Sequence, residues 1–246
     1  MQPEKKQLEI LLIDYFRRSY PDFPKGRVVS SESPDFWVRM KSKNVIGIEL
    51  TRLNPANAIP PDDQQTREIL FRDELIQNAK EIFERSSEIK LYVKVLFSDT
   101  KKIRSERAMS VSVRLAGLIR NTLVTSKYDV FNRVVLGKNV LPEGLEEVLV
   151  IQHPKLKTAM WERSNNLGIS NDVVDDIRQA IRKKDEKLRL YQKNHLNYYW
   201  LLITTDFLQG VKSFNLHNKI MNHRFESRFQ HVFLFDLIKS KVYELV

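Results

Sequence analysis

The sequence predicts a mixed α/β fold, because segments typical of strands and of amphipathic helices alternate along the chain. Residues 198–205, "YYWLLITT", are almost continuously apolar, as in a buried strand. In residues 170–193, just before them, apolar residues recur every three or four positions, which is the spacing of one side of a helix. No repeat and no Gly/Ser linker divides the chain. We therefore expect one domain over residues 1–246, with a mixed central sheet flanked by helices and an inserted middle region.

Each element is placed by its periodicity and by its start and stop signals. Helices are predicted at residues 4–18, 64–85, 103–123 and 170–193. Strands are predicted within residues 28–53 (two or three strands) and at residues 89–97, 147–152, 198–205 and 231–238. Asp62 or Asp63 can cap the second helix, and Ser170 or Asn171 can cap the fourth. Residues 127–146 carry one clear signal, the "LPEG" turn.

The composition favours a folded protein, and its charge is compatible either with an anionic partner or with a basic but otherwise ordinary surface. The hydrophobic fraction is 42%, which is enough for a sizeable core. The absence of Cys excludes disulfides and thiolate metal sites and favours a reducing compartment. No apolar run reaches the ~20 residues of a membrane span, and residues 1–18 lack the apolar core of a signal peptide, so we expect a cytoplasmic protein. A net charge of +10 attracts polyanions such as nucleic acid.

Residues 32–53, "ESPDFWVRMKSKNVIGIELTRL", predict a hairpin that carries two acids. Residues that pair in an antiparallel hairpin have a constant sum of their numbers, and Asp35 with Glu49 gives 84, which centres the turn at Ser42 in "KSKN". Side-chain alternation then puts both carboxylates on one face, with space beside them at Gly47. Two carboxylates this close repel each other unless a cation such as Mg²⁺ lies between them.

An ordinary structural role would also explain these acids. Glu49 could pair with Arg39 or Arg52, while Asp35 caps a turn after Pro34. A shift of the register by one residue would put the two acids on opposite faces of the hairpin. Spacing alone leaves both interpretations open.

The same residues resemble the PD-(D/E)XK nuclease superfamily, which has the restriction-endonuclease-like fold. Pro34 and Asp35 resemble the family's first motif element, and Glu49, 14 positions after Asp35, resembles the glutamate of the second. The resemblance covers residues 4–53 and about 171–205, and about 100–146 would be an insertion. It implies a nuclease in which Asp35 and Glu49 bind Mg²⁺ or Mn²⁺, and the metal activates water for attack on a phosphodiester.

Thr51 departs from the family pattern, because it stands where the family has a catalytic lysine. Threonine can donate a hydrogen bond but carries no positive charge. Members of the superfamily can place this lysine on a neighbouring core helix, and the helix at 170–193 resembles such a unit in bacterial proteins of this fold. Lys184 interrupts its apolar side and is our first choice, with Lys187 second. Both lysines could equally extend to solvent.

Further candidates surround this set. In the family an acid of the first helix often joins the metal site, and Glu9 lies on a stripe with two apolar residues that could turn it inward. It could equally be an exposed helix acid. Basic residues of the late helix are candidates for phosphate contacts, or they form a solvated face. They are Arg178, Arg182, Lys183 and Arg189.

Three functions are compatible with these observations. The first is a metal-dependent nuclease with DNA as the expected substrate, and a homodimer would let two sites cut both strands of a duplex. The second is a nucleic-acid-binding or assembly module that kept the fold and lost catalysis, which Thr51 favours. The third is a protein-interaction partner that does not bind nucleic acid. No zinc finger, Walker loop or RNA-recognition motif is present in the sequence.

Overall fold

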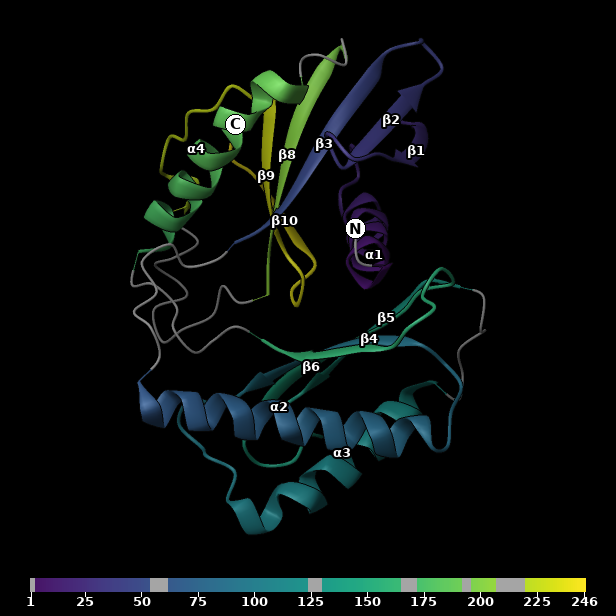
Figure 1. Cartoon of the computed structure of the whole chain (residues 1–246), viewed down its shortest axis with the longest axis vertical. Coiled ribbons are helices and arrows are strands. Elements are labelled where there is room, and N and C mark those ends of the chain that lie inside the picture. The colour runs from purple at the N-terminus through teal and green to yellow at the C-terminus, as the bar shows by residue number, and fades with distance from the viewer. Residues whose placement is uncertain (1–2, 54–61, 124–129, 165–171, 192–195, 207–219) are drawn as a thin grey trace. The chain divides into compact units, whose positions relative to one another are not determined.

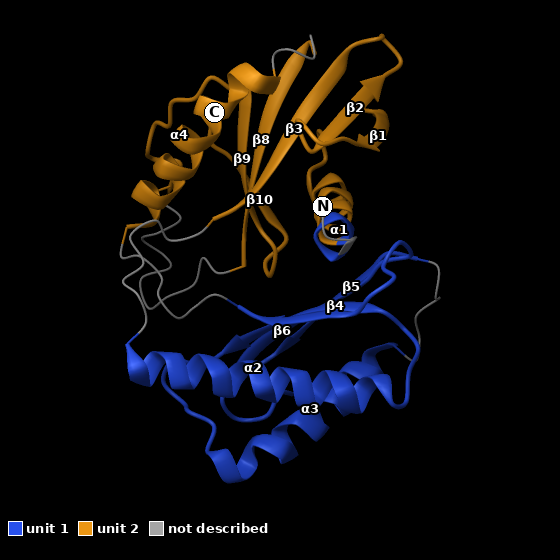
Figure 2. Cartoon of the chain, viewed as in Figure 1, with its two compact units in different colours: residues 1–7, 59–168 blue, residues 8–58, 169–246 orange. Residues whose placement is uncertain are grey.

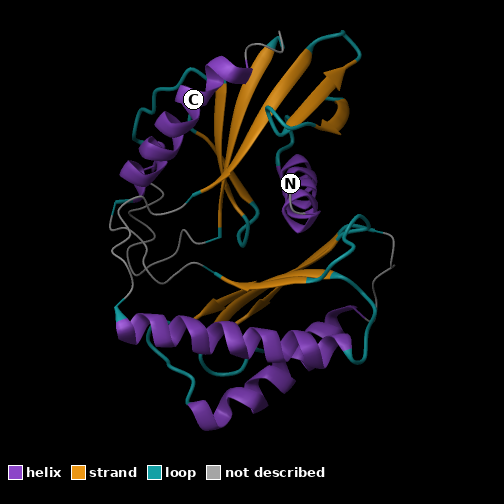
Figure 3. Ribbon diagram, in the orientation of Figure 1, coloured by secondary structure: helices purple, strands orange, loops and turns teal. Residues whose placement is uncertain are grey.

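The computed structural model describes all residues except 1–2, 54–61, 124–129, 165–171, 192–195 and 207–219 (Figure 1). It confirms a mixed α/β protein, and its described part holds two sheets and four α-helices (Figure 3). The chain forms two compact units, where we expected a single domain (Figure 2). Unit 1 consists of residues 1–7 and 59–168, and unit 2 of residues 8–58 and 169–246. The long segment of unit 1, residues 59–168, lies between the two segments of unit 2 and includes the insertion expected at about 100–146.

Unit 2 is built on a six-stranded sheet in the order β1-β2-β3-β8-β9-β10. Its strands are β1 (Gly26–Ser30), β2 (Phe36–Met40), β3 (Val45–Arg52), β8 (Tyr198–Thr205), β9 (His231–Asp236) and β10 (Lys241–Glu244). The three central strands β3, β8 and β9 are parallel, and the outer pairs are antiparallel. Parallel strands are usually buried on both faces, which agrees with the apolar run that predicted β8.

Two helices cover opposite faces of this sheet: α1 (Pro3–Ser19) and α4 (Val173–Tyr191) (Figure 1). On β9, Phe233 and Phe235 contact Phe16 of α1. The alternate residues Val232 and Leu234 lie in the apolar cluster that α4 shares with the sheet. This alternation is what the period of two in a strand requires.

The apolar side of α4 is the one predicted from its spacing. Its four apolar members are at most 5% exposed. They are Ile177, Ile181, Leu188 and Tyr191. They pack against Leu201 and Ile203 of β8. Of the five residues predicted for this side, Lys184 alone is charged. It brings an ammonium group to the side of α4 that faces the sheet. The N-cap predicted at Ser170 or Asn171 lies outside the described residues, and Asp172 Oδ1 accepts hydrogen bonds from the backbone N–H groups of Val174 and Asp175.

Unit 1 has a four-stranded sheet in the order β5-β6-β4-β7. Its strands are β4 (Leu91–Phe97), β5 (Asn132–Gly137), β6 (Leu145–Gln152) and β7 (Met160–Arg163). Two helices, α2 (Asp63–Glu84) and α3 (Ala108–Leu123), pack on one face of it, and the short 3₁₀ helix η1 (Ser105–Arg107) leads into α3. The Ser112 hydroxyl donates to the carbonyl of Leu75 and joins the two helices. Unit 1 therefore has a core of its own.

The described helices contain none long and apolar enough to cross a membrane.

We predict that Asp62→Ala lowers the free energy of unfolding by about 1 kcal/mol. Asp62 caps α2: its Oδ1 accepts from the backbone N–H of Gln65 at 2.7 Å, and the Gln65 side chain accepts from the backbone N–H of Asp62 at 3.2 Å. Urea denaturation would measure the loss. Asp63→Ala is the matched control, because it removes the same charge in the same turn without the capping box. Equal losses in the two variants would contradict the capping role.

Candidate functional site

The hairpin has the predicted register. Phe36 pairs with Ile48 and Val38 with Ile46, so that the sum is 84 along the ladder of β2 and β3. Asp35 directly precedes β2, and the same register places it opposite Glu49. The turn lies in "KSKN", where Lys43 has a positive φ of 68°. The register of β2 and β3 therefore places the carboxylates of Asp35 and Glu49 side by side, as predicted.

The space expected beside the carboxylates at Gly47 is filled. A Cβ atom at Gly47 would lie 2.6 Å from Pro34 Cγ and 2.7 Å from Leu196 Cδ1. Pro34 is buried, and the segments before β2 and before β8 thus approach the backbone of β3 closely. Glycine serves here for close packing and does not leave room for a ligand.

Lys184 reaches the hairpin from α4. Its Nζ lies 2.7 Å from Glu49 Oε1, and the two side chains are 15% and 8% exposed. Glu49 pairs in register with Leu201 of β8, which is part of the cluster that α4 covers. A charged residue on the apolar side of α4 therefore meets a charged residue on the covered face of β3. The positively charged group beside Glu49 Oε1 is thus the ammonium of Lys184 on α4. From the sequence alone, Arg39 and Arg52 were also possible partners of Glu49.

Tyr191 is a further member of the site that the sequence reasoning assigned only to packing. Burial raises the pKa of its phenol, and the charge of Glu49 and a hydrogen bond to Glu49 raise that pKa further. Tyr191 lies seven positions after Lys184 on the same side of α4, which is the signal that could have identified it. The two residues hold Glu49 from one helix.

Asp35 is held by the backbone of β3. Its Oδ2 accepts a hydrogen bond from the N–H of Leu50 at 2.8 Å. Its pKa is raised to about 6, first because burial disfavours the carboxylate and then because Glu49 and Glu9 are negatively charged. The hydrogen bond from Leu50 and the charge of Lys184 oppose this rise. Asp35 is therefore a carboxyl group that loses its proton at a higher pH than an ordinary aspartate does.

Glu9 is buried, with 5% of its surface exposed, and its charge acts on Asp35. Of the two interpretations of this helix acid, the structure agrees with the inward one. Among the described residues, however, no three acidic or histidine side chains lie close enough together to form a ready metal site. Any cation at Asp35 and Glu49 would complete its shell with water or substrate oxygens.

The remaining candidates are Thr51, Lys187 and the four basic residues of α4. Thr51 is half-buried on β3, and its carbonyl accepts from the Thr204 hydroxyl at 3.4 Å. Lys187 is exposed, as are three of the four basic residues proposed for phosphate contacts, Arg182, Lys183 and Arg189. The fourth, Arg178, forms an ion pair with Asp175 at 3.2 Å. Arg178 and Arg182 line an open pocket of about 510 Å³ with Arg224 and Arg228, so basic groups do gather beside α4.

No family model, no curated protein and no solved structure matches this chain.

We predict that Asp35→Asn stabilises the protein at pH 7.5 by about 1–2 kcal/mol. Asp35 has a pKa of about 6 when folded and an ordinary value of 3.8, so the folded protein binds more protons than the unfolded chain between these pH values. Asp35 thus lowers the free energy of unfolding of the wild type as pH rises from about 4 to 6, and the Asp35→Asn variant lacks this contribution.

Denaturant unfolding at pH 4, 5, 6 and 7.5 would measure the difference between the two proteins. Asp22→Asn, which changes an exposed acid of the same unit and keeps Asp35, is the control, and its unfolding should follow the pH dependence of the wild type. A difference that is flat with pH would show that Asp35 ionises in the folded protein as it does in the unfolded chain.

Proposed function

We propose that the protein is a metal-dependent nuclease that hydrolyses phosphodiester bonds, with DNA as its substrate. The observation that supports this most is the contact of 2.7 Å between Lys184 Nζ and Glu49 Oε1. It brings an ammonium group to the acid pair at the place where Thr51 leaves the motif without a cation. The set of Asp35, Glu49 and Lys184 thus has the chemical groups of the motif, with the lysine supplied by α4.

The two carboxylates fit a hard divalent cation. Burial and the charge of Glu49 raise the pKa of Asp35, and a bound cation would remove this repulsion. Mg²⁺ usually binds one or two carboxylates and keeps several waters, so two acids suffice. When bound, the ion would polarise the phosphodiester and lower the pKa of a coordinated water.

The chain's own groups position these ligands. The N–H of Leu50 donates to Asp35 Oδ2 at 2.8 Å and so fixes the orientation of this carboxylate. Lys184 and Tyr191 orient Glu49. The Lys184 ammonium also supplies positive charge beside the carboxylates, where it could stabilise negative charge that develops on a phosphate.

We predict that Glu49→Gln and Lys184→Met each reduce Mg²⁺-dependent cleavage of DNA by at least about 100-fold. Plasmid, single-stranded DNA and RNA would be incubated with Mg²⁺ or Mn²⁺ and resolved on gels. Lys187→Met discriminates between the two lysines, because Lys187 is exposed on the same helix. A large loss in Lys187→Met with little loss in Lys184→Met would overturn the assignment of the displaced cation.

We predict that about 10 mM Mg²⁺ raises the melting temperature of the wild type at pH 8 and has little effect at pH 5. Asp35 is largely protonated below its pKa of about 6 and then cannot ligate a cation. For a Kd of about 1 mM, the gain would be about 1.4 kcal/mol. Differential scanning fluorimetry would measure the shift, and Asp35→Asn should remove it. An equal shift at both pH values, or in Asp35→Asn, would place the metal elsewhere.

The second candidate is a nucleic-acid-binding module without catalysis. It is favoured by the direct ion pair, since Lys184 already neutralises Glu49 without a metal. In that case the pair would serve to dock α4 on β3. Tight binding of DNA or RNA, with no cleavage in Mg²⁺ or Mn²⁺, would support the module over the nuclease.

A further inference from the structure

The positive charge of unit 1 is concentrated in one short segment. Residues 1–7 and 59–168 hold 20 Lys and Arg and 16 Asp and Glu, which gives a net charge of +4. Residues 101–114 hold five basic residues and one acid, which is also a net +4. The rest of unit 1 therefore has a net charge of zero. The positive charge of unit 1 is thus localised in this segment and is not spread evenly over its surface.

The fold gathers these five basic side chains around one groove. Lys101, Lys102, Arg104, Arg107 and Arg114 all line an open groove of about 480 Å³ beside η1 and the start of α3. Each of them is exposed. The groove continues through both lysines into a smaller pocket of about 250 Å³, which is also lined by Arg67 and Arg72.

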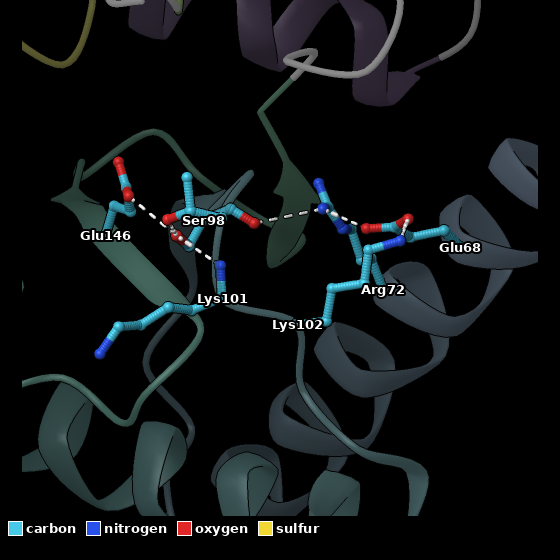
Figure 4. Close-up of polar contacts among 7 residues, drawn as sticks. Glu68, Arg72, Ser98, Lys101, Lys102 and Glu146 are labelled. Carbon is cyan, nitrogen blue, oxygen red and sulfur yellow. Dashed lines mark hydrogen bonds and ion pairs between the residues drawn. The ribbon is translucent and has the colours of Figure 1, made fainter. Parts of the chain in front are cut away.

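The base of this surface is held by a polar network around the buried Arg72 (Figure 4). Arg72 is 4% exposed, binds Glu68 and lies 5.0 Å from the ring centroid of Phe97. Glu68 also binds the Lys102 ammonium at 3.0 Å, and these two cations lower its pKa against the effect of burial. Glu68 thus joins α2 to the segment that carries the basic residues.

A second anchor lies at the end of β4 (Figure 4). The Ser98 hydroxyl donates to Glu146 Oε1 at 3.0 Å and accepts from the backbone N–H of Lys101 at 3.3 Å. The Ser98 backbone N–H donates to the carbonyl of Gly144 at 2.9 Å. The backbone leading to the basic residues is therefore held at both α2 and β6, and their side chains are presented from a fixed base.

The basic groups are available for a ligand. Within the described part of the chain, Arg104 and Arg114 form no ion pair. Lys101 and Arg107 share Glu143 at 3.2 Å and 3.7 Å, and all three side chains are more than half exposed. Such exposed pairs contribute little and can exchange for a phosphate.

We propose that residues 101–114 of unit 1 bind the phosphate backbone of a nucleic acid. A single small anion would engage two or three cations, whereas a strand presents a phosphate about every 3.4 Å along each chain. Guanidinium groups are suited to phosphate oxygens because they donate two parallel hydrogen bonds. This proposal deepens the proposed function, on which it rests for the identity of the polyanion, and it assigns the inserted unit to substrate binding.

Fluorescence anisotropy of the full chain with a labelled 30-base-pair duplex and the matching single strand, in EDTA to prevent cleavage, tests this surface. We expect Arg104→Ala/Arg114→Ala to weaken binding about tenfold near 50 mM salt. The slope of log K against log salt for the duplex should fall by about 1.8, corresponding to two phosphates. Arg85→Ala/Arg120→Ala removes the same charge from exposed positions of unit 1 outside both pockets and should change binding less than twofold.

The outcomes separate this proposal from the nuclease. Equal binding by both double variants would reject the proposal that residues 101–114 bind nucleic acid, whatever the cleavage assay shows. Loss of binding in Arg104→Ala/Arg114→Ala, combined with a wild type that never cleaves, leaves the surface standing and rejects the nuclease. A wild type that binds neither nucleic acid at low salt overturns both. Circular dichroism melting of each variant checks that the fold is intact, and Arg104→Gln/Arg114→Gln serves as a second pair if the alanine variant is destabilised.

Discussion

The ion pair between Lys184 and Glu49 is the interaction around which the candidate site of unit 2 is built. Both side chains are nearly buried, so each charge has lost much of its hydration and relies on the other. Replacing one partner of such a pair leaves an isolated buried charge, which costs about 3–5 kcal/mol. The pair fixes α4 over β3 through residues 135 positions apart. The same two groups, Lys184 Nζ and Glu49 Oε1, therefore hold α4 on the sheet and belong to the proposed active site.

The acids around this pair lower the stability of the folded protein, because they are buried close to one another. Burial raises the pKa of Asp35, and the negative charges of Glu49 and Glu9 raise it further, against the single ammonium group of Lys184. Buried groups with perturbed pKa values tend to gather at functional sites. The raised pKa of Asp35 is thus a second sign of a ligand site, beside the ion pair.

The parts of the site that depend on local periodicity could be predicted from the sequence. The pleat and the turn determine which residue lies opposite Glu49, and helical spacing puts Lys184 on the covered side of α4. Tyr191 was missed because an aromatic residue on such a side is usually only core. The short strands β7 and β10 carry too few residues for a pattern. The two units could not be separated, because their segments alternate without a linker and long-range pairing decides the boundary.

The parallel pairing of β3 and β8 has a consequence for how the chain folds. Glu49 and Leu201 are neighbours in the sheet but 152 positions apart in the sequence, with unit 1 between them. Closing so long a loop is entropically unfavourable, and non-local pairings of this kind form slowly. A compact unit 1 would shorten the flexible part of that loop before the strands meet. The inserted unit would then fold first and act as a spacer that helps the two halves of the sheet find each other.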